Sequence, residues 1–375
     1  MSRWLIVSGS ANALARSCVA AGWTCDVVDG YGDADTAAHA GRIARAGLRH
    51  GSFGSDLPGV IAGMKGNWAG IVTGSGFEAR PSLLDALAAF APLAGNGART
   101  TRHCKAPATF ADLMTQSGVR HAPVAVDGHA AAGWLVKRTG GCGGAHVRAA
   151  RGGERIRRGH HAQLRIAGMP ASALFLADGE RARIVGVSRQ WPGSEAGPYA
   201  WAEAISDLAL PDTMRGALAR DIDAITRQFG LRGLNGVDLV IGDGHHVVIE
   251  INPRPTATMP LYEGRVVGGL FAAHVAACEG RLDEVDMTGA GGTLGLRVVY
   301  APRDLIVGDD VEWPAWCTDL PASGSRIRRA TPLCTVHASA IDGTGAGALL
   351  AAREREVLGM TGLRAGQMKT RTVFS

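Results

Sequence analysis

The feature that most constrains this chain is a pair of apolar runs joined by a short turn, between residues 236 and 256. Both runs are rich in Val and Ile, and the Gly-Asp-Gly-His sequence between them is a strong signal for a β-hairpin. Each run also holds one carboxylate in an otherwise apolar pattern, Asp238 in the first and Glu250 in the second. Two buried carboxylates side by side repel each other unless a cation neutralises them. The pattern therefore favours a cation site over a surface hairpin with two ordinary acids.

The alternation of side chains along a strand predicts which of these residues share a face. Glu250 and Asn252 are two positions apart and fall on one face, whereas the intervening apolar residues, Ile249 among them, fall on the other. If the turn has an odd number of residues, such as 243–245, Asp238 stands opposite Glu250 on the same face. Oxygen ligands of this kind suit Mg²⁺ held jointly by protein and nucleotide phosphates.

A glycine-rich loop upstream of the hairpin is the second strong element. The apolar run from Trp134 delivers Lys137, and four glycines follow it within five residues: Gly140, Gly141, Gly143 and Gly144. Gly-rich backbone can wrap closely around phosphates, and no Gly-Lys-Ser/Thr follows to make this a Walker A motif. Such a run alone could be a flexible connector, but beside a metal hairpin it indicates nucleotide binding. Cys142 inside the loop has no base to activate it and is interpreted as a small tolerated residue.

Length and composition bound the remaining possibilities. The 375 residues are enough for two or three lobes, and 46% apolar with 19% charged residues is ordinary for a globular protein. A net charge of +5 with few aromatic residues and dispersed Lys and Arg argues against nucleic-acid binding. Seven scattered Cys indicate neither a zinc site nor a disulfide framework and fit a reducing cytoplasm. We find neither a signal peptide nor a membrane-spanning stretch, so we expect a cytoplasmic protein.

The N-terminal part reads as a doubly wound α/β unit. Strands are expected at 4–7, 23–29 and 70–73, with helices at about 13–21 and 83–90. The first turn has one Gly where a dinucleotide-binding fingerprint needs three, which argues against that ligand. Loops at the strand ends of such a sheet face a binding crevice. The candidate substrate contacts in these loops, each of which could instead cap a helix, are Asn12, Asp33 and Glu78.

Two further segments carry candidate residues whose functional and solvated interpretations are nearly equal in weight. The arm at 183–191 ends in Arg189 and Gln190, which could reach phosphates or the acceptor, or end a solvated strand. The basic stretch 99–105 contains Lys105 as the better candidate for a phosphate contact and Arg102 as the reserve. A solvated linker is the alternative for that stretch.

The order Asp, hairpin, Glu-x-Asn-x-Arg, together with the Lys and glycine loop, resembles the ATP-grasp superfamily. The resemblance implies that Asp238, Glu250 and Asn252 bind Mg²⁺ on ATP, with Mn²⁺ as an alternative ion, and that Arg254 faces an acyl-phosphate. It also implies that Lys137 contacts the phosphates while the glycine loop closes over them, and that Lys105 adds a phosphate contact. The segment before the strand at 171–179 would then bind adenine through Leu164 to Ile166, and Gln163 stands where many relatives carry Glu.

The same resemblance implies an α/β ATP-grasp fold in three parts. A Rossmann-like pre-ATP-grasp domain would span 1–95. The ATP-grasp domain would span 96–290, with a small lobe at about 105–180 and a metal-binding lobe at about 181–290. A small barrel-like, β-rich lobe would close the chain at 291–375.

Other motifs, from the Gly-Ser-Ala-Asn turn at 9–12 to Trp-Pro-Ala-Trp at 313–316, resemble one ATP-grasp group. It is the predicted ATP-dependent carboligase group of methylotrophs, linked to tetrahydromethanopterin and methanofuran one-carbon metabolism. The archaeal tyramine–glutamate ligase of methanofuran biosynthesis is a cousin of that group. The resemblance implies an ADP-forming ligase that joins a small-molecule carboxylate to an amine, and a homodimer. We keep two alternatives: a carboxylase that activates bicarbonate, and a nucleotide-binding regulator without chemistry.

Overall fold

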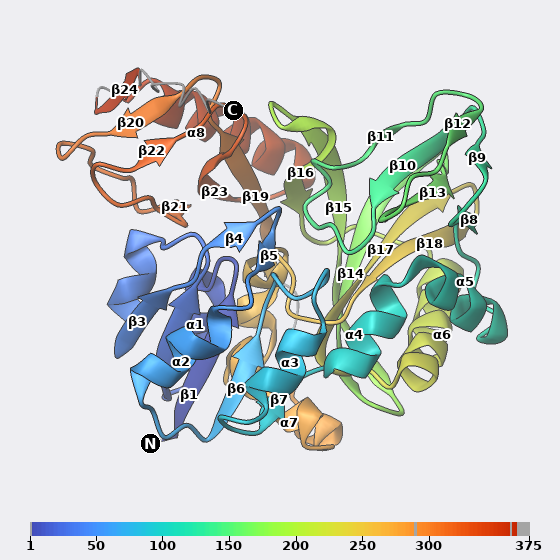
Figure 1. Ribbon diagram of the computed structural model, residues 1–375, viewed down its shortest axis with the longest axis horizontal. Coiled ribbons are helices and arrows are strands. Elements are labelled where there is room, and N and C mark those ends of the chain that lie inside the picture. Colours follow the sequence, from blue (N-terminus) through green and yellow to red (C-terminus); the bar gives the residue numbers. More distant parts are fainter. Residues whose placement is uncertain (1, 289–290, 361, 366–375) are drawn as a thin grey trace, which may run out of the picture.

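The computed structural model describes residues 2–288, 291–360 and 362–365, and its N-terminal part is built on a five-stranded parallel sheet (Figure 1). Leu5, Ile6 and Val7 are fully buried, as expected for a parallel strand covered on both faces. The sheet order is β3-β2-β1-β6-β7, with bounds Arg42–Arg45, Thr24–Asp29, Arg3–Ser8, Gly70–Thr73 and Leu93–Ala94. Its helices are α1 (Asn12–Ala20), η1 (Ala34–His39), α2 (Leu57–Met64) and α3 (Ser82–Leu87), the last ending earlier than the expected 83–90.

A large antiparallel sheet of eight strands forms the centre of the molecule. Its order is β18-β17-β14-β15-β16-β19-β23-β21, with bounds His245–Asn252, Arg232–Gly242, Met169–Asp178, Ala182–Ser194, Gly197–Ile205, Thr293–Tyr300, Pro332–Ala340 and Cys317–Thr318. Helix α6 (Asp212–Phe229) packs on one face of the sheet in a core that includes Ile222 and Val237. Helix α7 (Gly269–Cys278) packs on the other face and joins the sheet to α1 in a second core. The sheet therefore separates two environments, of which only one faces the N-terminal part.

A smaller four-stranded sheet lies beside the β17–β18 hairpin, as Figure 1 shows. Its order is β11-β10-β13-β8, with bounds Arg148–Ala149, Trp134–Arg138, His160–Leu164 and Val124–Ala125. A two-stranded pair, β9 (His129–Ala130) with β12 (Glu154–Arg155), extends from it. Helices α4 (Ala98–Lys105) and α5 (Pro107–Gln116) connect this sheet to the N-terminal one. The glycine loop thus directly follows β10, an inner strand of the small sheet, and leads to the edge strand β11.

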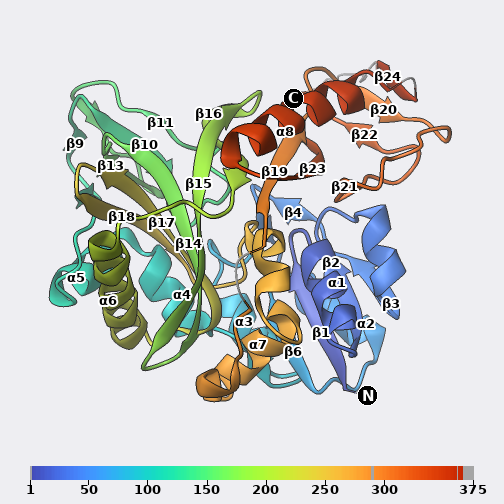
Figure 2. The same ribbon diagram turned by 180° about the vertical axis from the view of Figure 1, so that it is seen from behind.

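The C-terminal strands continue the central sheet, because β19 pairs with β16. Helix α8 (Gly343–Leu358) packs on β19 and β23, which Figure 2 shows from behind. A three-stranded sheet lies beyond it, formed by β20 (Leu305–Val307), β22 (Arg326–Ile327) and β24 (Leu363–Ala365). This region is β-rich as expected, but part of its sheet belongs to the centre of the molecule. Among the described residues, no helix is both long and apolar enough to cross a membrane.

Candidate active site

The β17–β18 hairpin places Asp238 opposite Glu250, although by a different route from the one expected. Gly242 pairs with His245, so the turn has two residues, Asp243 and Gly244, rather than three. A β-bulge between Asp238 and Leu239 restores the pairing, since the ladder shifts and Ile249 has no partner in it. The even turn and the extra residue together bring the two carboxylates face to face.

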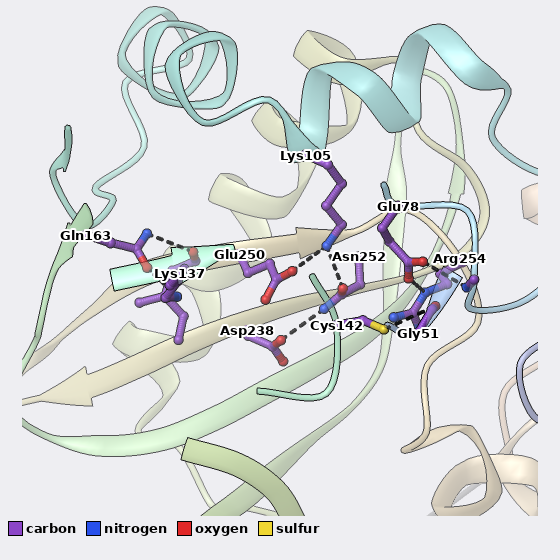
Figure 3. A network of polar contacts seen from close by, with 12 residues as sticks. Gly51, Glu78, Lys105, Lys137, Cys142, Gln163, Asp238, Glu250, Asn252 and Arg254 are labelled. Carbon is purple, nitrogen blue, oxygen red and sulfur yellow. Dashed lines mark hydrogen bonds and ion pairs between the residues drawn. The ribbon is translucent and has the colours of Figure 1, made fainter. Parts of the chain in front are cut away.

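The Lys105 ammonium lies between the hairpin side chains, as Figure 3 shows. Its Nζ donates to Glu250 Oε1 at 2.5 Å and to Asn252 Oδ1 at 2.8 Å. The amide of Asn252 in turn donates to Asp238 Oδ2 at 2.9 Å. Lys105 is the last residue of helix α4 and is buried, so the position of α4 places the Lys105 charge at the hairpin. The structure therefore brings Lys105 together with all three predicted metal ligands.

The pKa values of the two hairpin carboxylates are shifted in opposite directions. Burial and the neighbouring Glu250 charge raise the pKa of Asp238 above its usual range. Burial alone would also raise the pKa of Glu250, but the Lys105 and Lys137 charges outweigh it and lower this pKa to about 2. Burial lowers the pKa of Lys137, although the charges of both carboxylates act to raise it. A further cation at the hairpin would relieve the repulsion felt by Asp238.

Lys137 is held beside the hairpin by Gln163. Lys137 Nζ donates to Gln163 Oε1 at 2.6 Å, and Gln163 Nε2 donates to the backbone oxygen of Ile249 at 3.0 Å. The side chain of Gln163 is therefore engaged by protein on both ends. The Leu164 amide donates to Pro123 O at 2.9 Å, so in this structure it is not available to a base. The predicted adenine contacts of residues 163, 164 and 166 remain predictions.

The glycine loop packs against two other parts of the chain. A Cβ at Gly144, whose φ is +74°, would lie 2.0 Å from Tyr199 O on β16. A Cβ at Gly140 would lie 2.6 Å from Ala79 Cα in the loop after β6. Gly143 O accepts a hydrogen bond from Trp201 N at 2.9 Å. Glycine is thus required at positions 140 and 144 for close backbone approach, which holds the loop over the site.

Arg254 is fixed by a buried partner from the N-terminal part. Its Nε donates to Glu78 Oε1 at 2.5 Å, and Glu78 Oε2 accepts from Gly76 N at 2.8 Å. Burial would raise the pKa of Glu78, but the Arg254 and Lys105 charges lower it overall. In the structure the Glu78 carboxylate binds and orients Arg254, and its predicted contact with substrate remains a prediction (Figure 3).

Comparisons with known proteins agree with this architecture. Residues 112–258 match a family described as an ATP-grasp domain. An L-amino acid ligase from Bacillus licheniformis superimposes with a TM-score of 0.71 at 13% identity, covering 98% of this chain and 99% of that one. The chain has the ATP-grasp fold. No curated protein sequence matches it.

Two other solved ATP-grasp relatives are similar over nearly the whole chain. The biotin carboxylase domain of the Hydrogenobacter thermophilus 2-oxoglutarate carboxylase, in complex with MgADP and bicarbonate, has a TM-score of 0.70 at 13% identity, with 97% and 92% coverage of this and that chain. A Staphylococcus aureus N5-carboxyaminoimidazole synthetase has a TM-score of 0.66 at 11% identity, with 94% and 97% coverage. The expected α/β ATP-grasp fold, with its N-terminal parallel sheet, is therefore confirmed.

The donors on the ATP-grasp hairpin fit a hard divalent cation. Asp238 and Glu250 offer carboxylate oxygens and Asn252 an amide oxygen, and no softer ligand lies among them. Two of these oxygens already contact the Lys105 ammonium, so the site accepts positive charge. The set leaves coordination positions for phosphate oxygens and water, which is typical of Mg²⁺ at nucleotides.

The structure brings one of the two predicted β15 residues to the site. Gln190 Nε2 donates to Asp238 Oδ1 at 3.4 Å. The Arg189 guanidinium instead stacks on Trp191, 4.4 Å from the ring centroid. Because side chains alternate along a strand, Arg189 and Trp191 lie on the opposite face of the sheet from Gln190. The predicted contact of Arg189 with phosphates or acceptor is not seen, because the residue faces away from the hairpin.

Two N-terminal candidates, Asn12 and Asp33, are buried. Asn12 is almost fully buried, and its amide has no hydrogen-bond partner in the structure. Asp33 lies with Asp29, Asp35 and Asp319, where burial and these like charges raise its pKa to about 9. We call this group, Asp29, Asp33, Asp35 and Asp319, the aspartate cluster. It joins the N-terminal sheet to β21 through the amides of Asp319 and Leu320, which donate to Asp35.

Two parts of the site were not predicted from the sequence. Ser172 on β14 lies opposite Asp238, and its hydroxyl favours the charged carboxylate. A buried serine between Ala171 and Ala173 was the signal that could have found it. The hairpin of β4 (Leu48–Arg49) and β5 (Ser52–Phe53) is also unforeseen. The backbone oxygen of Gly51 in that turn accepts from Cys142 Sγ at 3.7 Å, so the turn contacts the glycine loop.

Proposed function

We propose that this protein is an ATP-dependent, ADP-forming ligase that joins a carboxylate to an amine through an acyl-phosphate. The observation that carries the proposal is the convergence of Lys105, the β17–β18 hairpin and the Glu78–Arg254 pair in one buried site. Lys137 and the glycine loop border the same site. Cationic side chains beside a hairpin with cation-binding donors suit phosphoryl transfer, in which catalysis is mainly positioning and charge neutralisation.

Each residue then has a stated role. Asp238, Glu250 and Asn252 would hold Mg²⁺, which neutralises phosphate charge when bound. Lys137 and Lys105 orient the phosphates of ATP, and the substrate carboxylate attacks the γ-phosphorus to release ADP. Arg254 binds the acyl-phosphate oxygens through its guanidinium, and Glu78 keeps that guanidinium in place. The amine attacks the acyl carbon and phosphate leaves, giving an amide and one proton.

For the substrates, we propose a glutamate-like amino acid and the amine precursor of a one-carbon cofactor, such as methylofuran or a tetrahydromethanopterin derivative. The resemblance to the methylotroph carboligase group supports this choice. The structural likeness to an L-amino acid ligase is consistent with an amino acid as one of the two substrates.

A carboxylase that activates bicarbonate is the second candidate. The Glu-x-Asn-x-Arg spacing and the likeness to a biotin carboxylase domain with bound bicarbonate favour it. A biotin-carrier motif, Ala-Met-Lys-Met, is absent from this sequence. The carboxylase therefore lacks the support that such a motif would give, and the ligase remains our choice.

The deciding experiment follows ATP consumption with Mg²⁺ while glutamate and amine acceptors, including tyramine, are screened against bicarbonate. We expect ADP and phosphate only when both an amino acid and an amine are present. ADP formation that depends on bicarbonate alone would establish the carboxylase instead. AMP as the product would contradict the acyl-phosphate mechanism, and nucleotide binding without any turnover would point to a regulator.

The glycine loop provides a matched pair of variants for the same assay. Gly144→Ala adds a methyl group that would lie 2.0 Å from Tyr199 O, whereas Gly143→Ala meets nothing within 4 Å. Both glycines have φ near +70°, so the two variants share the same backbone strain. We expect Gly144→Ala to raise the KM for ATP at least about 10-fold above that of Gly143→Ala, since 1.4 kcal/mol of lost contact corresponds to tenfold. Equal effects would show that the contact with β16 does not support ATP binding.

A further inference from the structure

A cavity of about 650 Å³ lies on the opposite face of the central sheet from the metal hairpin. It is enclosed by β15, β16, β19 and helix α8, and glycines such as Gly347 leave room within it. Trp191 and Glu203 are paired across β15 and β16, and Glu203 pairs with Arg297 across β16 and β19. These side chains therefore share a face, and Gln190, which contacts Asp238, lies on the other. The volume is in the range of small-molecule sites.

One guanidinium in this cavity serves two carboxylates. Arg297 Nε donates to Glu203 Oε2 at 2.6 Å, and Arg297 Nη1 donates to Glu354 Oε2 at 2.7 Å. The side chain of Glu203 is only 7% exposed. Both pairs use Oε2, and no residue of the described chain donates a hydrogen bond to Oε1 of either glutamate. Two carboxylates therefore share one guanidinium in this group.

The free oxygen of Glu203 lies against the hollow. A Cβ built at Gly347, which lines the cavity, would come within 3.9 Å of Glu203 Oε1. A single guanidinium meets one oxygen of each carboxylate, and Glu354 is 31% exposed, so the remaining carboxylate oxygens are open to a further donor. Trp191 and Tyr300 supply aromatic surface in the same cavity. An acidic hollow with aromatic walls suits an organic cation.

We propose that this cavity binds a small protonated primary amine, with its ammonium on Glu203 and Glu354 and its apolar body against Trp191 and Tyr300. The site is separate from the reaction centre, so it does not depend on the proposed ligase activity. Its ligand is recognised by charge and by size.

Calorimetric titration of the full chain without nucleotide or Mg²⁺ tests this site. Benzylamine is the probe, and benzyl alcohol is the uncharged control of nearly equal size. We expect benzylamine to bind at least about 10-fold more tightly than benzyl alcohol, because the ammonium makes charge-assisted hydrogen bonds to the carboxylates, whereas the alcohol hydroxyl donates only a neutral one. Equal affinity, or no binding of benzylamine at millimolar concentration, would overturn the proposal.

Four variants place the binding in the cavity. Gly347→Val projects methyl groups into the hollow and should abolish binding, while Gly216→Val makes the same change in α6, away from the cavity, and should leave it intact. Glu203→Gln should weaken binding at least about 10-fold. Asp238→Asn alters the metal hairpin and should leave binding unchanged. Retention of binding in Gly347→Val, or its loss in Asp238→Asn, would show that the amine binds elsewhere.

Discussion

The carboxylates of the β17–β18 hairpin face cationic side chains, whereas the aspartate cluster faces neutral donors. Lys105 donates directly to Glu250, and its charge helps to lower the pKa of that group to about 2. In the cluster, Asp319 accepts from the hydroxyls of Ser10 and Thr335, and within the described ranges none of the four aspartates forms an ion pair. The pKa of Asp33 accordingly rises to about 9.

This difference separates the proposed reaction site from a contact that holds two parts of the fold together. A carboxylate that is held by an ammonium can exchange that ammonium for another cation without leaving its position. A carboxylate that is held by backbone amides and hydroxyls is fixed by geometry, as Asp35 is by the amides of residues 319 and 320. Burial of an acid is common to both groups, so burial alone does not identify the active site.

Glu250→Gln tests the hairpin side of the comparison and should have the largest effect. The variant keeps the size of the side chain but removes the charge that faces Lys105, so we expect turnover to fall at least about 100-fold. Steady-state ATP consumption measures this, and thermal unfolding should stay cooperative. Asp243→Asn, in the exposed turn of the same hairpin, is the control. Loss of cooperative unfolding in Glu250→Gln would show that the residue is structural.

Lys105→Met removes the cation and leaves the hairpin carboxylates uncompensated. We expect the free energy of unfolding to fall by about 1–3 kcal/mol, less than for a fully buried pair because the Glu250 side chain is 36% exposed. Millimolar Mg²⁺ should stabilise this variant more than the wild type, since it takes over the missing charge. Urea unfolding with and without Mg²⁺ measures both effects, with the exposed Lys65→Met as control. An equal gain from Mg²⁺ in all three proteins would contradict a cation site at the hairpin.

Glu78→Gln loosens the partner of Arg254 without removing the guanidinium. We expect the KM for the carboxylate substrate to rise about 10-fold with a smaller change in kcat, because Arg254 is present but less well oriented. Initial rates at varied carboxylate concentration measure the split. Glu180→Gln, an exposed change of the same kind, should behave as wild type. A KM unchanged from wild type would remove Glu78 from the site.

Asp33→Asn tests the aspartate cluster and should have the smallest effect. The folded-state pKa of Asp33, about 9, lies above its unfolded value near 4, so the folded protein binds an extra proton between these pH values. Stability from this group is complete below pH 4 and is lost as pH rises through 9. We expect the free energy of unfolding of the wild type to fall between pH 6 and pH 9. In Asp33→Asn the slope of this fall should be smaller by the amount that corresponds to about one proton.

Thermal unfolding at several pH values measures the Asp33 effect. Asp85→Asn, an exposed change on α3, is the control and should keep the wild-type slope. Catalytic activity of Asp33→Asn should remain within about twofold of wild type, because the cluster faces no reacting group. A large loss of turnover would place Asp33 in the reaction site and would end the distinction between the two groups.

The resemblance of the chain's motifs implied the ATP-grasp fold, and the face-to-face carboxylates were predicted because polar exceptions in apolar strands are local signals. The sequence could not predict which strand face a residue takes after an irregularity. The odd turn was wrong, and a bulge near Ile249 produced the expected pairing instead. Arg189 and Gln190 were predicted together, yet alternation sends them to opposite faces.

Contacts between distant segments were also beyond the sequence. The meeting of Glu78 with Arg254 joins residues 176 positions apart, and no local pattern links them. The same holds for Gly51 with Cys142 in the glycine loop. Lys105 was identified as a cation near the site, but its place between Glu250 and Asn252 depends on how helix α4 packs against the hairpin.

The bulge at Ile249 has a mechanical consequence. Its carbonyl is released from the regular ladder of the hairpin and accepts a hydrogen bond from Gln163, which also holds Lys137. The distance between Lys137 and the hairpin is therefore set through the backbone oxygen of Ile249, and not by the carboxylates of Asp238 and Glu250. Substitution of Asp238 or Glu250 would leave this hydrogen bond in place, whereas deletion of Ile249 would change the distance between Lys137 and the hairpin. The one extra residue in the bulge therefore links the small sheet, which carries Lys137, to the β17–β18 hairpin.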